Sequence, residues 1–164
     1  MKKALPKIAF IVFLVLTAAA FTGFIVLRMQ KKHAVEADLE ALGAELESAG
    51  LTEYMTGGSA LELKRRYGLY AEEYPALLYF APETYMNVEE ILVVRISSDR
   101  QGDAVEEAVD AERASLMDAF ESYGIDQYSH LKNAVRYRNE FYVCYAAGEK
   151  AEEILAAIRR AIER

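Results

Sequence analysis

The sequence predicts an α+β fold in which an N-terminal transmembrane helix precedes a small two-layer α/β sandwich with a mostly antiparallel sheet. A charge-free apolar run predicts the transmembrane helix, and it extends from Ile8 to Leu27. Short β-branched runs bounded by turn residues predict strands, and apolar residues at spacings of three and four predict helices. The resulting order, ααββαββα, favours an antiparallel sheet with helices over one of its faces.

The apolar run of residues 8–27 has the length of a membrane span. Its 20 residues would rise about 30 Å as a helix, which is the thickness of the hydrocarbon layer of a bilayer. Basic residues flank it on both sides, at Lys2, Lys3, Lys7, Arg28, Lys31 and Lys32. We expect residues 1–7 to be cytoplasmic, residues 8–27 to be a single-pass signal anchor in the cell membrane, and the remainder to be extracytoplasmic.

A cleaved signal peptide is the alternative to an anchor, because Ala18 and Ala20 form an Ala-x-Ala pattern after a basic start. The apolar run continues through Leu27, however, whereas the apolar core of a signal peptide is only about 7 to 15 residues long. Retention of the segment as an anchor is therefore the favoured interpretation.

Residues 28–58 are expected to form a juxtamembrane helix and loop. Four apolar residues share one helical face: Val35, Leu39, Leu42 and Leu46. This face packs against its own domain, which we favour, or pairs with a neighbouring chain as a stalk, for which two heptads are few. Gly50 ends the helix, and the Thr-Gly-Gly sequence of residues 56–58 indicates a loop.

Residues 59–164 are expected to form the extracytoplasmic α+β domain. Ser59 and Glu62 have the spacing of a capping box, and the helix that they begin should end near Tyr67, before Gly68. The further elements expected are strands at Ala76–Phe80 and Glu90–Ser97, a helix at Asp103–Tyr123, strands at Ala134–Arg138 and Glu140–Ala146 around a tight turn, and a helix at Lys150–Ile162.

The charge distribution argues against binding to nucleic acid. The first 33 residues hold six Lys and Arg and no acidic residue, so 13 basic and 26 acidic residues lie from Ala34 onward. Proteins grip phosphate backbones with clustered Lys and Arg, and a domain this acidic would be repelled.

Catalytic, cofactor and metal motifs are absent from the sequence. Cys144 is the single cysteine and lies in an apolar strand, where a thiol is usually a small buried apolar group. His33 and His130 are the only histidines, and His130 is expected in a loop as an exposed polar residue. The sequence therefore predicts no catalytic, cofactor-binding or metal-binding residues and no cofactor.

Paired carboxylates leave one enzymatic alternative open. Three acidic pairs could supply the two carboxylates of a hydrolase directed at the cell wall, namely Glu72 with Glu73, Glu89 with Glu90, and Asp99 with Asp103, with Glu72, Glu73 or Glu89 as acid and base. None of these pairs has the ligand spacing of a calcium loop, and acidic pairs are most often solvated surface groups.

Tyrosine is the least ordinary part of the composition, with eleven tyrosines and no tryptophan. A tyrosine ring with its hydroxyl suits binding surfaces, although strand tyrosines commonly occupy half-buried positions in a sheet. We predict Tyr70, Tyr74 and Tyr85 as partner-binding residues.

The C-terminal hundred residues resemble a bacterial family described as domain of unknown function 4358 (DUF4358), which occurs on exported lipoproteins and single-pass proteins of Gram-positive bacteria. The resemblance rests on the strand EEILVVRI at residues 89–96, on the helix from Arg113 to Tyr123, and on the hairpin AVRYRNEFYVCYA at residues 134–146. It implies the fold and an exported, membrane-anchored location, and it implies no activity.

Together these features predict a membrane-anchored, extracytoplasmic and non-enzymatic binding or interaction domain of a bacterial cell envelope. Its expected partners are the membrane and an envelope protein or cell-wall component. The alternatives are the cell-wall hydrolase with paired carboxylates and a self-associating structural stalk protein.

Overall fold

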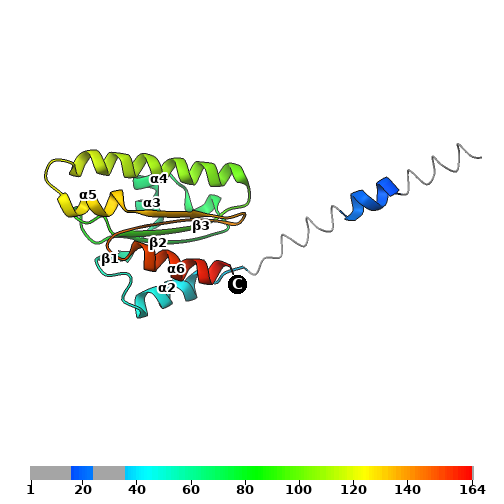
Figure 1. The fold of residues 1–164 in the computed structure, drawn as a ribbon, viewed down its shortest axis with the longest axis horizontal. Helices are drawn as coiled ribbons and strands as arrows, with labels where there is room; N and C mark the ends of the chain where they lie inside the picture. Colours follow the sequence, from blue (N-terminus) through cyan, green and yellow to red (C-terminus); the bar gives the residue numbers. More distant parts are fainter. Residues whose placement is uncertain (1–15, 24–35, 164) are drawn as a thin grey trace, which may run out of the picture. The chain divides into compact units, whose positions relative to one another are not determined.

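The computed structural model describes residues 16–23 and 36–163 of the chain, and Figure 1 shows their helices and strands. The chain divides into two compact units, Met1–Glu36 and Ala37–Arg164. In the first unit, residues 16–23 are helical. The second unit contains the sheet and the helices described below, and it is called the domain from here on.

The predicted transmembrane helix is not part of the fold that the structure describes. No helix within residues 16–23 and 36–163 is both long enough and apolar enough to cross a membrane. The predicted fold class is wrong on this point, and the remainder of the predicted helix lies outside the described residues.

Five strands form one antiparallel sheet in the domain. They are β1 (Met55–Gly57), β2 (Ala76–Pro82), β3 (Glu90–Arg95), β4 (Val135–Arg138) and β5 (Tyr142–Ala147). Their order across the sheet is β1-β2-β3-β5-β4, and every neighbouring pair is antiparallel. The sheet fits the α+β class, and the predicted C-terminal hairpin is confirmed as β4 and β5.

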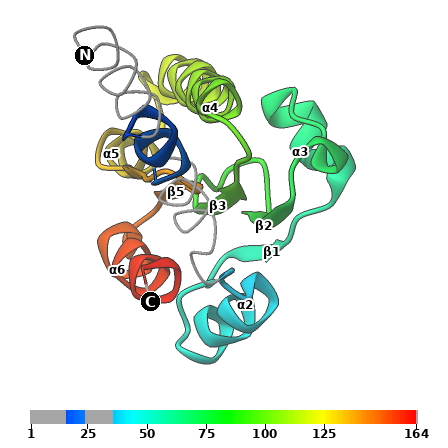
Figure 2. The ribbon, with the colours of Figure 1, turned by 90° about the vertical axis from the view of Figure 1, so that its right-hand side faces the viewer.

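Helices cover both faces of the sheet, as Figure 2 shows. α2 (Leu39–Ser48) and α6 (Ala151–Ile162) pack on one face, whereas α3 (Ala60–Tyr67) and α4 (Asp99–Phe120) pack on the other. α5 (Ile125–Lys132) follows α4, and the short 3-10 helix η1 (Ala71–Glu73) precedes β2. The predicted two-layer sandwich is therefore wrong, because the domain has three layers.

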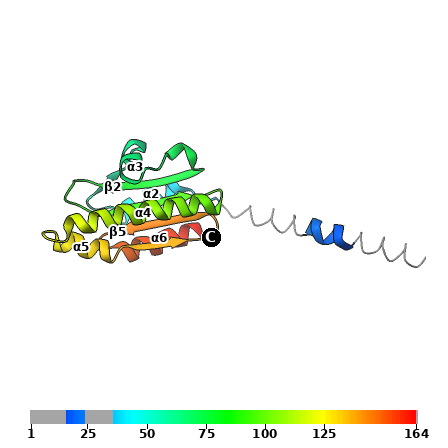
Figure 3. The same cartoon turned by 90° about the horizontal axis from the view of Figure 1, so that it is seen from above.

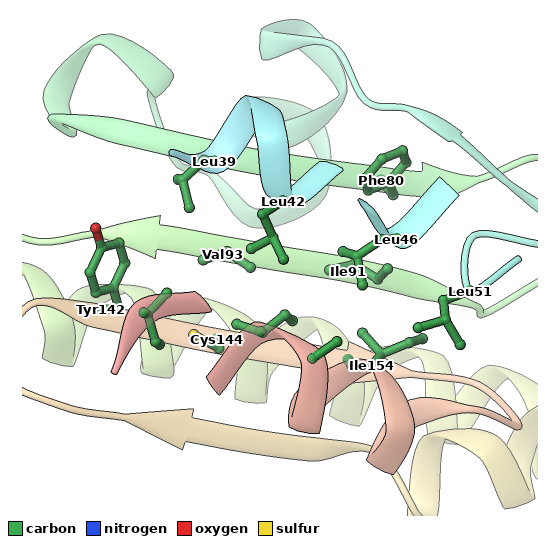
Figure 4. Packing of buried hydrophobic residues seen from close by; sticks show 14 of the residues in the cluster. Leu39, Leu42, Leu46, Leu51, Phe80, Ile91, Val93, Tyr142, Cys144 and Ile154 are labelled. Atoms are coloured by element: carbon green, nitrogen blue, oxygen red, sulfur yellow. The ribbon is translucent and has the colours of Figure 1, made fainter. Parts of the chain in front are cut away.

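The central strand β3 gives the physical reason for the third layer. Ile91 and Val93 pack in the core under α2 and α6, and Leu92 and Val94 pack in the core under α3 and α4. All four side chains are fully buried. An uninterrupted apolar strand has no face that water can cover, so each face needs its own helices. Figure 4 shows the first core, where α2 lies against the sheet.

Helix α2 is packed on its own domain, as the favoured interpretation of its apolar face predicts. Leu39, Leu42 and Leu46 are buried in the core that α2 shares with α6. The helix begins after Asp38, whose Oδ1 accepts hydrogen bonds from the amides of the first turn. Val35 lies outside the described residues. Both α2 and β1 fall within residues 28–58, which we placed before the domain, and both belong to the compact unit Ala37–Arg164.

Two elements, β1 and α5, carry no clear sequence signal. β1 occupies part of the predicted loop at residues 56–58 and is held by pairing with the end of β2. α5 places His130 in a helix, where we predicted a loop. α4 also begins at Asp99 rather than at Asp103, because the Ser98 hydroxyl accepts a hydrogen bond from the Gln101 amide and caps the helix there.

Candidate functional site

A cleft with a volume of about 460 Å³ opens where α3, the end of β2 and the middle of α4 meet. Its lining side chains include Glu62, Arg65 and Arg66 from α3, Tyr79 from β2, Tyr85 from the loop after β2, and Glu112 from α4. Charged groups of both signs and aromatic rings therefore share one concave surface, which is the composition of a site for a polar ligand or peptide segment.

Local hydrogen bonds fix the position of α3 at the cleft. The amide of Ser59 donates to Oε2 of Glu62 at 2.8 Å, and the amide of Glu62 donates to Oγ of Ser59 at 3.2 Å. This is the capping box predicted from the sequence, and it is confirmed. Gly68 closes the other end of the helix with a φ of 69°, a left-handed conformation that favours glycine.

A buried ion pair lies directly behind the cleft. Nε of Arg66 is 3.0 Å from Oε2 of Glu90 and 3.4 Å from Oε1 of Glu112. The side chain of Glu90 is 1% exposed, and it is the one buried charged residue in the described part of the chain. Arg66 and Glu112 retain about a fifth of their exposure and line the cleft, whereas Glu90 does not line it.

Burial and charge shift the pKa values of this cluster in opposite directions. Burial raises the pKa of Glu90 to about 7, and the nearby Arg66 guanidinium opposes that rise. Burial also raises the pKa of Glu112, again against the effect of Arg66. Burial has the largest single effect on the pKa of Arg66 and lowers it, but the charge of Glu90 together with smaller contributions from Tyr67, Tyr79 and Glu112 outweighs burial, so the net shift is upward. The guanidinium therefore remains charged while Glu90 titrates near neutral pH.

Three tyrosine hydroxyls complete the buried cluster, and they belong to Tyr67, Tyr79 and Tyr145. All three are buried; those of Tyr79 and Tyr145 have no hydrogen-bond partner in the described structure, whereas a hydrogen bond from the Tyr67 hydroxyl lowers the pKa of Glu90. Burial raises the pKa of each, and the charge of Glu90 raises it further, which places all three hydroxyls near that carboxyl. Nη2 of Arg66 is likewise buried without a partner. The cluster therefore holds unused hydrogen-bonding capacity behind the cleft.

The structure separates the three predicted partner-binding tyrosines. Tyr85 is fully exposed and lines the cleft. Tyr70 and Tyr74 flank η1 before the start of β2, whereas Tyr85 follows the end of that strand. The ring of Tyr70 lies 4.6 Å from Nζ of Lys64, and the ring of Tyr74 packs partly buried against the core under α3 and α4. Only Tyr85 belongs to the cleft.

Our sequence prediction of partner-binding residues does not include the buried cluster of Arg66, Glu90 and Glu112. One feature of the sequence, the position of Glu90 in its strand, could have indicated it. Residues of β3 alternate between the two faces, so Glu90 shares the face of Leu92 and Val94. A carboxylate on the buried face of a central strand requires a cation nearby. Arg66 and Glu112 supply the charges around it, but their positions depend on how α3 and α4 pack.

The pair Glu72 and Glu73 of the hydrolase alternative lies at the other end of the sheet from Glu89. Glu72 and Glu73 are exposed on η1, before β2 begins. Glu89 precedes β3 at the opposite end of the sheet, where its Oε1 lies 3.2 Å from Nδ1 of His130. Among the described residues, no group of three His, Cys, Asp or Glu side chains could hold a metal ion. Cys144 is buried, and burial raises the pKa of its thiol to about 12.

Comparison with protein families finds one matching family model. The model is described as Domain of unknown function (DUF4358) and matches residues 47–148, from the end of α2 through β5. Comparisons with curated proteins and with solved structures find no match. The matched range covers the cleft, the buried Arg66–Glu90 pair and all five strands. The chain therefore belongs to the DUF4358 family.

Proposed function

We propose that this chain is a non-enzymatic binding domain of a bacterial cell envelope, and that it binds an envelope protein or a cell-wall component in the cleft between α3, β2 and α4. We further propose that residues 8–27 hold it at the cell membrane in a single pass, with the domain on the extracytoplasmic side. The length of the apolar run and its flanking basic residues support this location.

The cleft and the buried polar cluster behind it carry the proposal of binding. An unpaired buried hydroxyl costs about 1 to 3 kcal/mol of stability, and this fold keeps two of them, those of Tyr79 and Tyr145, around one carboxyl. Natural structures leave few such groups unpaired, and those that persist beside a cavity mark candidate binding sites. Tyr79 is the one of these tyrosines that lines the cleft, and water that orders with a ligand there would satisfy its hydroxyl.

The accessible surface of the cleft supports binding rather than catalysis. Tyr85 projects fully exposed at its edge and offers an aromatic anchor of the kind that dominates interface energies. Arg65 adds an exposed cation on the α3 side. Glu90 has the most shifted carboxyl pKa, but it does not line the cleft and cannot touch a ligand there. The cleft thus presents recognition groups, with its titrating carboxyl behind them.

Site-specific photocrosslinking in intact cells tests the proposal. A photoreactive amino acid at position 85 should capture a partner or wall fragment, and an added Arg65→Glu substitution should lower the yield. The matched control is the same photoreactive residue at position 70, because Tyr70 is exposed but lies outside the cleft. Equal capture at positions 70 and 85, or none at position 85, would contradict a binding cleft.

The proposed location has a separate test. Protease added to intact cells whose wall has been removed should digest the domain while cytoplasmic marker proteins survive. Protection of the domain until the membrane is permeabilised would contradict the extracytoplasmic side, and it would leave the cleft experiment interpretable.

A further inference from the structure

Exposed apolar side chains gather at one end of the domain. Seven large apolar or aromatic residues of the described domain are exposed, and five of them occupy three neighbouring connections. These five are Tyr54, Tyr85, Met86, Tyr123 and Ile125, with exposed fractions between 55% and 102%. We call this group the loop-end surface. Only Leu61 and Tyr70 lie elsewhere.

Contacts between the three connections hold the loop-end surface together. The amide of Glu83 donates to the carbonyl oxygen of Tyr54 at 2.9 Å, which joins the start of β1 to the loop after β2. Val88 of that loop is buried against Phe120 of α4 and Leu131 of α5. The rings of Phe120 and Tyr123 lie 5.5 Å apart. Figures 1 and 3 show the α4–α5 connection at this end of the sheet.

The chain enters the domain at the opposite end. The amide of Ala37 donates to the hydroxyl of Tyr142 at 3.1 Å, and Tyr142 is the first residue of β5. β5 then runs to Ala147, which pairs with Glu90 at the start of β3 and therefore lies at the loop end. Ala37, where the domain begins, thus lies at the end of the sheet opposite to the loop-end surface.

The segments that carry the loop-end surface are strongly acidic. Residues 49–54, 83–89 and 118–126, together with the adjoining β5–α6 connection of residues 148–150, contain seven carboxylates and one cation, Lys150. Lys150 pairs with Glu53, and Glu89 pairs with His130. The other five carboxylates form no ion pair among the described residues, and they are Glu83, Asp118, Glu121, Asp126 and Glu149. The segments that carry and adjoin the apolar patch therefore have an excess of negative charge.

We propose that the loop-end surface docks a basic amphipathic segment of another protein, in which Lys and Arg side chains flank apolar ones. Apolar residues of that segment would cover the aromatic rings, and its cations would pair with the carboxylates around them. A second copy of this chain would meet the surface with the same negative charge, and an anionic lipid surface would also be repelled. Charge complementarity therefore selects a basic protein segment as the occupant.

The proposal is independent of the cleft. Tyr85 borders both surfaces, but Tyr123 and Ile125 do not line the cleft. Arg65 lines the cleft and lies outside the loop-end surface. Variants at these positions therefore distinguish the two sites, and either proposal can fail without the other.

Photocrosslinking at position 125, in intact cells that express the full-length chain, tests the loop-end surface. The photoreactive residue should capture another protein, and mass spectrometry should map the adduct to a segment rich in Lys or Arg and apolar residues. The double substitution Glu121→Lys and Asp126→Lys should lower that yield about tenfold, as expected when binding weakens by about 1.4 kcal/mol. Arg65→Glu should leave it unchanged.

Position 61 provides the matched control, because Leu61 is an exposed apolar residue outside the loop-end surface. Several outcomes would overturn the proposal: no adduct at position 125, an adduct with a second copy of the chain or with lipid, a captured segment that is acidic, or equal capture at positions 61 and 125. A yield that survives the two charge reversals would also overturn it, because charge complementarity would then not determine the partner.

Discussion

Replacing Glu90 with glutamine should change how the stability of the domain depends on pH. The Glu90 carboxyl is 1% exposed, and burial raises its pKa from 4.5 to about 7. The folded state therefore holds this proton more tightly than the unfolded state does. Its contribution to stability is fully present below pH 4.5 and is lost as the pH rises through 7. Glu90→Gln carries no titrating proton and should not lose this contribution.

The size of the effect follows from the shift itself. A pKa difference of one unit corresponds to about 1.36 kcal/mol, so the rise from 4.5 to about 7 amounts to about 3 kcal/mol. At pH 5, wild type and Glu90→Gln should have nearly equal free energies of unfolding, because a protonated carboxyl and an amide are both neutral. By pH 8 the variant should be more stable by up to about 3 kcal/mol.

Urea unfolding of the full-length protein in a nonionic detergent measures this difference at pH 5, 6, 7 and 8. Near-ultraviolet circular dichroism can follow it, because the chain has eleven tyrosines and no tryptophan. The difference in urea midpoint should grow by about 1 to 2 M across this range. Glu72→Gln is the control, because it makes the same chemical change on an exposed residue. Midpoints that stay parallel for wild type and Glu90→Gln would refute the reasoning.

Three further variants or reagents probe the packing around the site. The Cys144 thiol is buried and its pKa is raised to about 12, so iodoacetamide at pH 8 should label it only after urea unfolding; rapid labelling of the native protein would contradict this burial. Gly68→Ala should cost about 1 kcal/mol in urea unfolding, because alanine strains at a φ of 69°; an unchanged midpoint would contradict the capping geometry. Gly58→Ala should displace the Tyr79 ring, since its Cβ would lie 2.2 Å from that ring; NMR signals of Tyr79 that match wild type would show that the close approach is absent.

Elements that depend on local residues are the ones that the sequence predicts well. The capping box of α3 needs only Ser59 and Glu62, and both hydrogen bonds are present. In the C-terminal hairpin, Oδ1 of Asn139 accepts hydrogen bonds from the amides of Phe141 and Tyr142, both at 2.8 Å. The side chain of one residue thus forms the turn, which is why a turn prediction at this position succeeds.

Elements that depend on distant partners are missed. β1 has three residues, one of them glycine, and its strand geometry comes from pairing with β2 rather than from its own propensity.

The third layer of the domain is a different case, because the ILVV run at residues 91–94 has no polar alternation and already implies two buried faces. The same β-branched run that predicts a strand thus also predicts that helices cover both of its sides.

The candidate site shows why closeness in sequence misleads inside a sheet. Tyr74 and Tyr85 are near each other along the chain, but the seven residues of β2 separate them and would extend about 23 Å. Arg66 and Glu90 are farther apart in sequence, yet their charged atoms lie 3.0 Å apart. Only the packing of α3 on the sheet brings that pair together, and periodicity carries no information on it.

The two proposed surfaces share an end of the domain, and this arrangement has a functional consequence. The cleft reaches Tyr85 in the loop after β2, and the same loop contributes Met86 to the loop-end surface. The chain enters the domain at the other end, beside Tyr142. The proposed anchoring through residues 8–27 would attach the domain at the end away from these recognition groups. Ala37 and the β2–β3 loop lie at opposite ends of the sheet, so neither proposed surface includes the residue at which the domain begins.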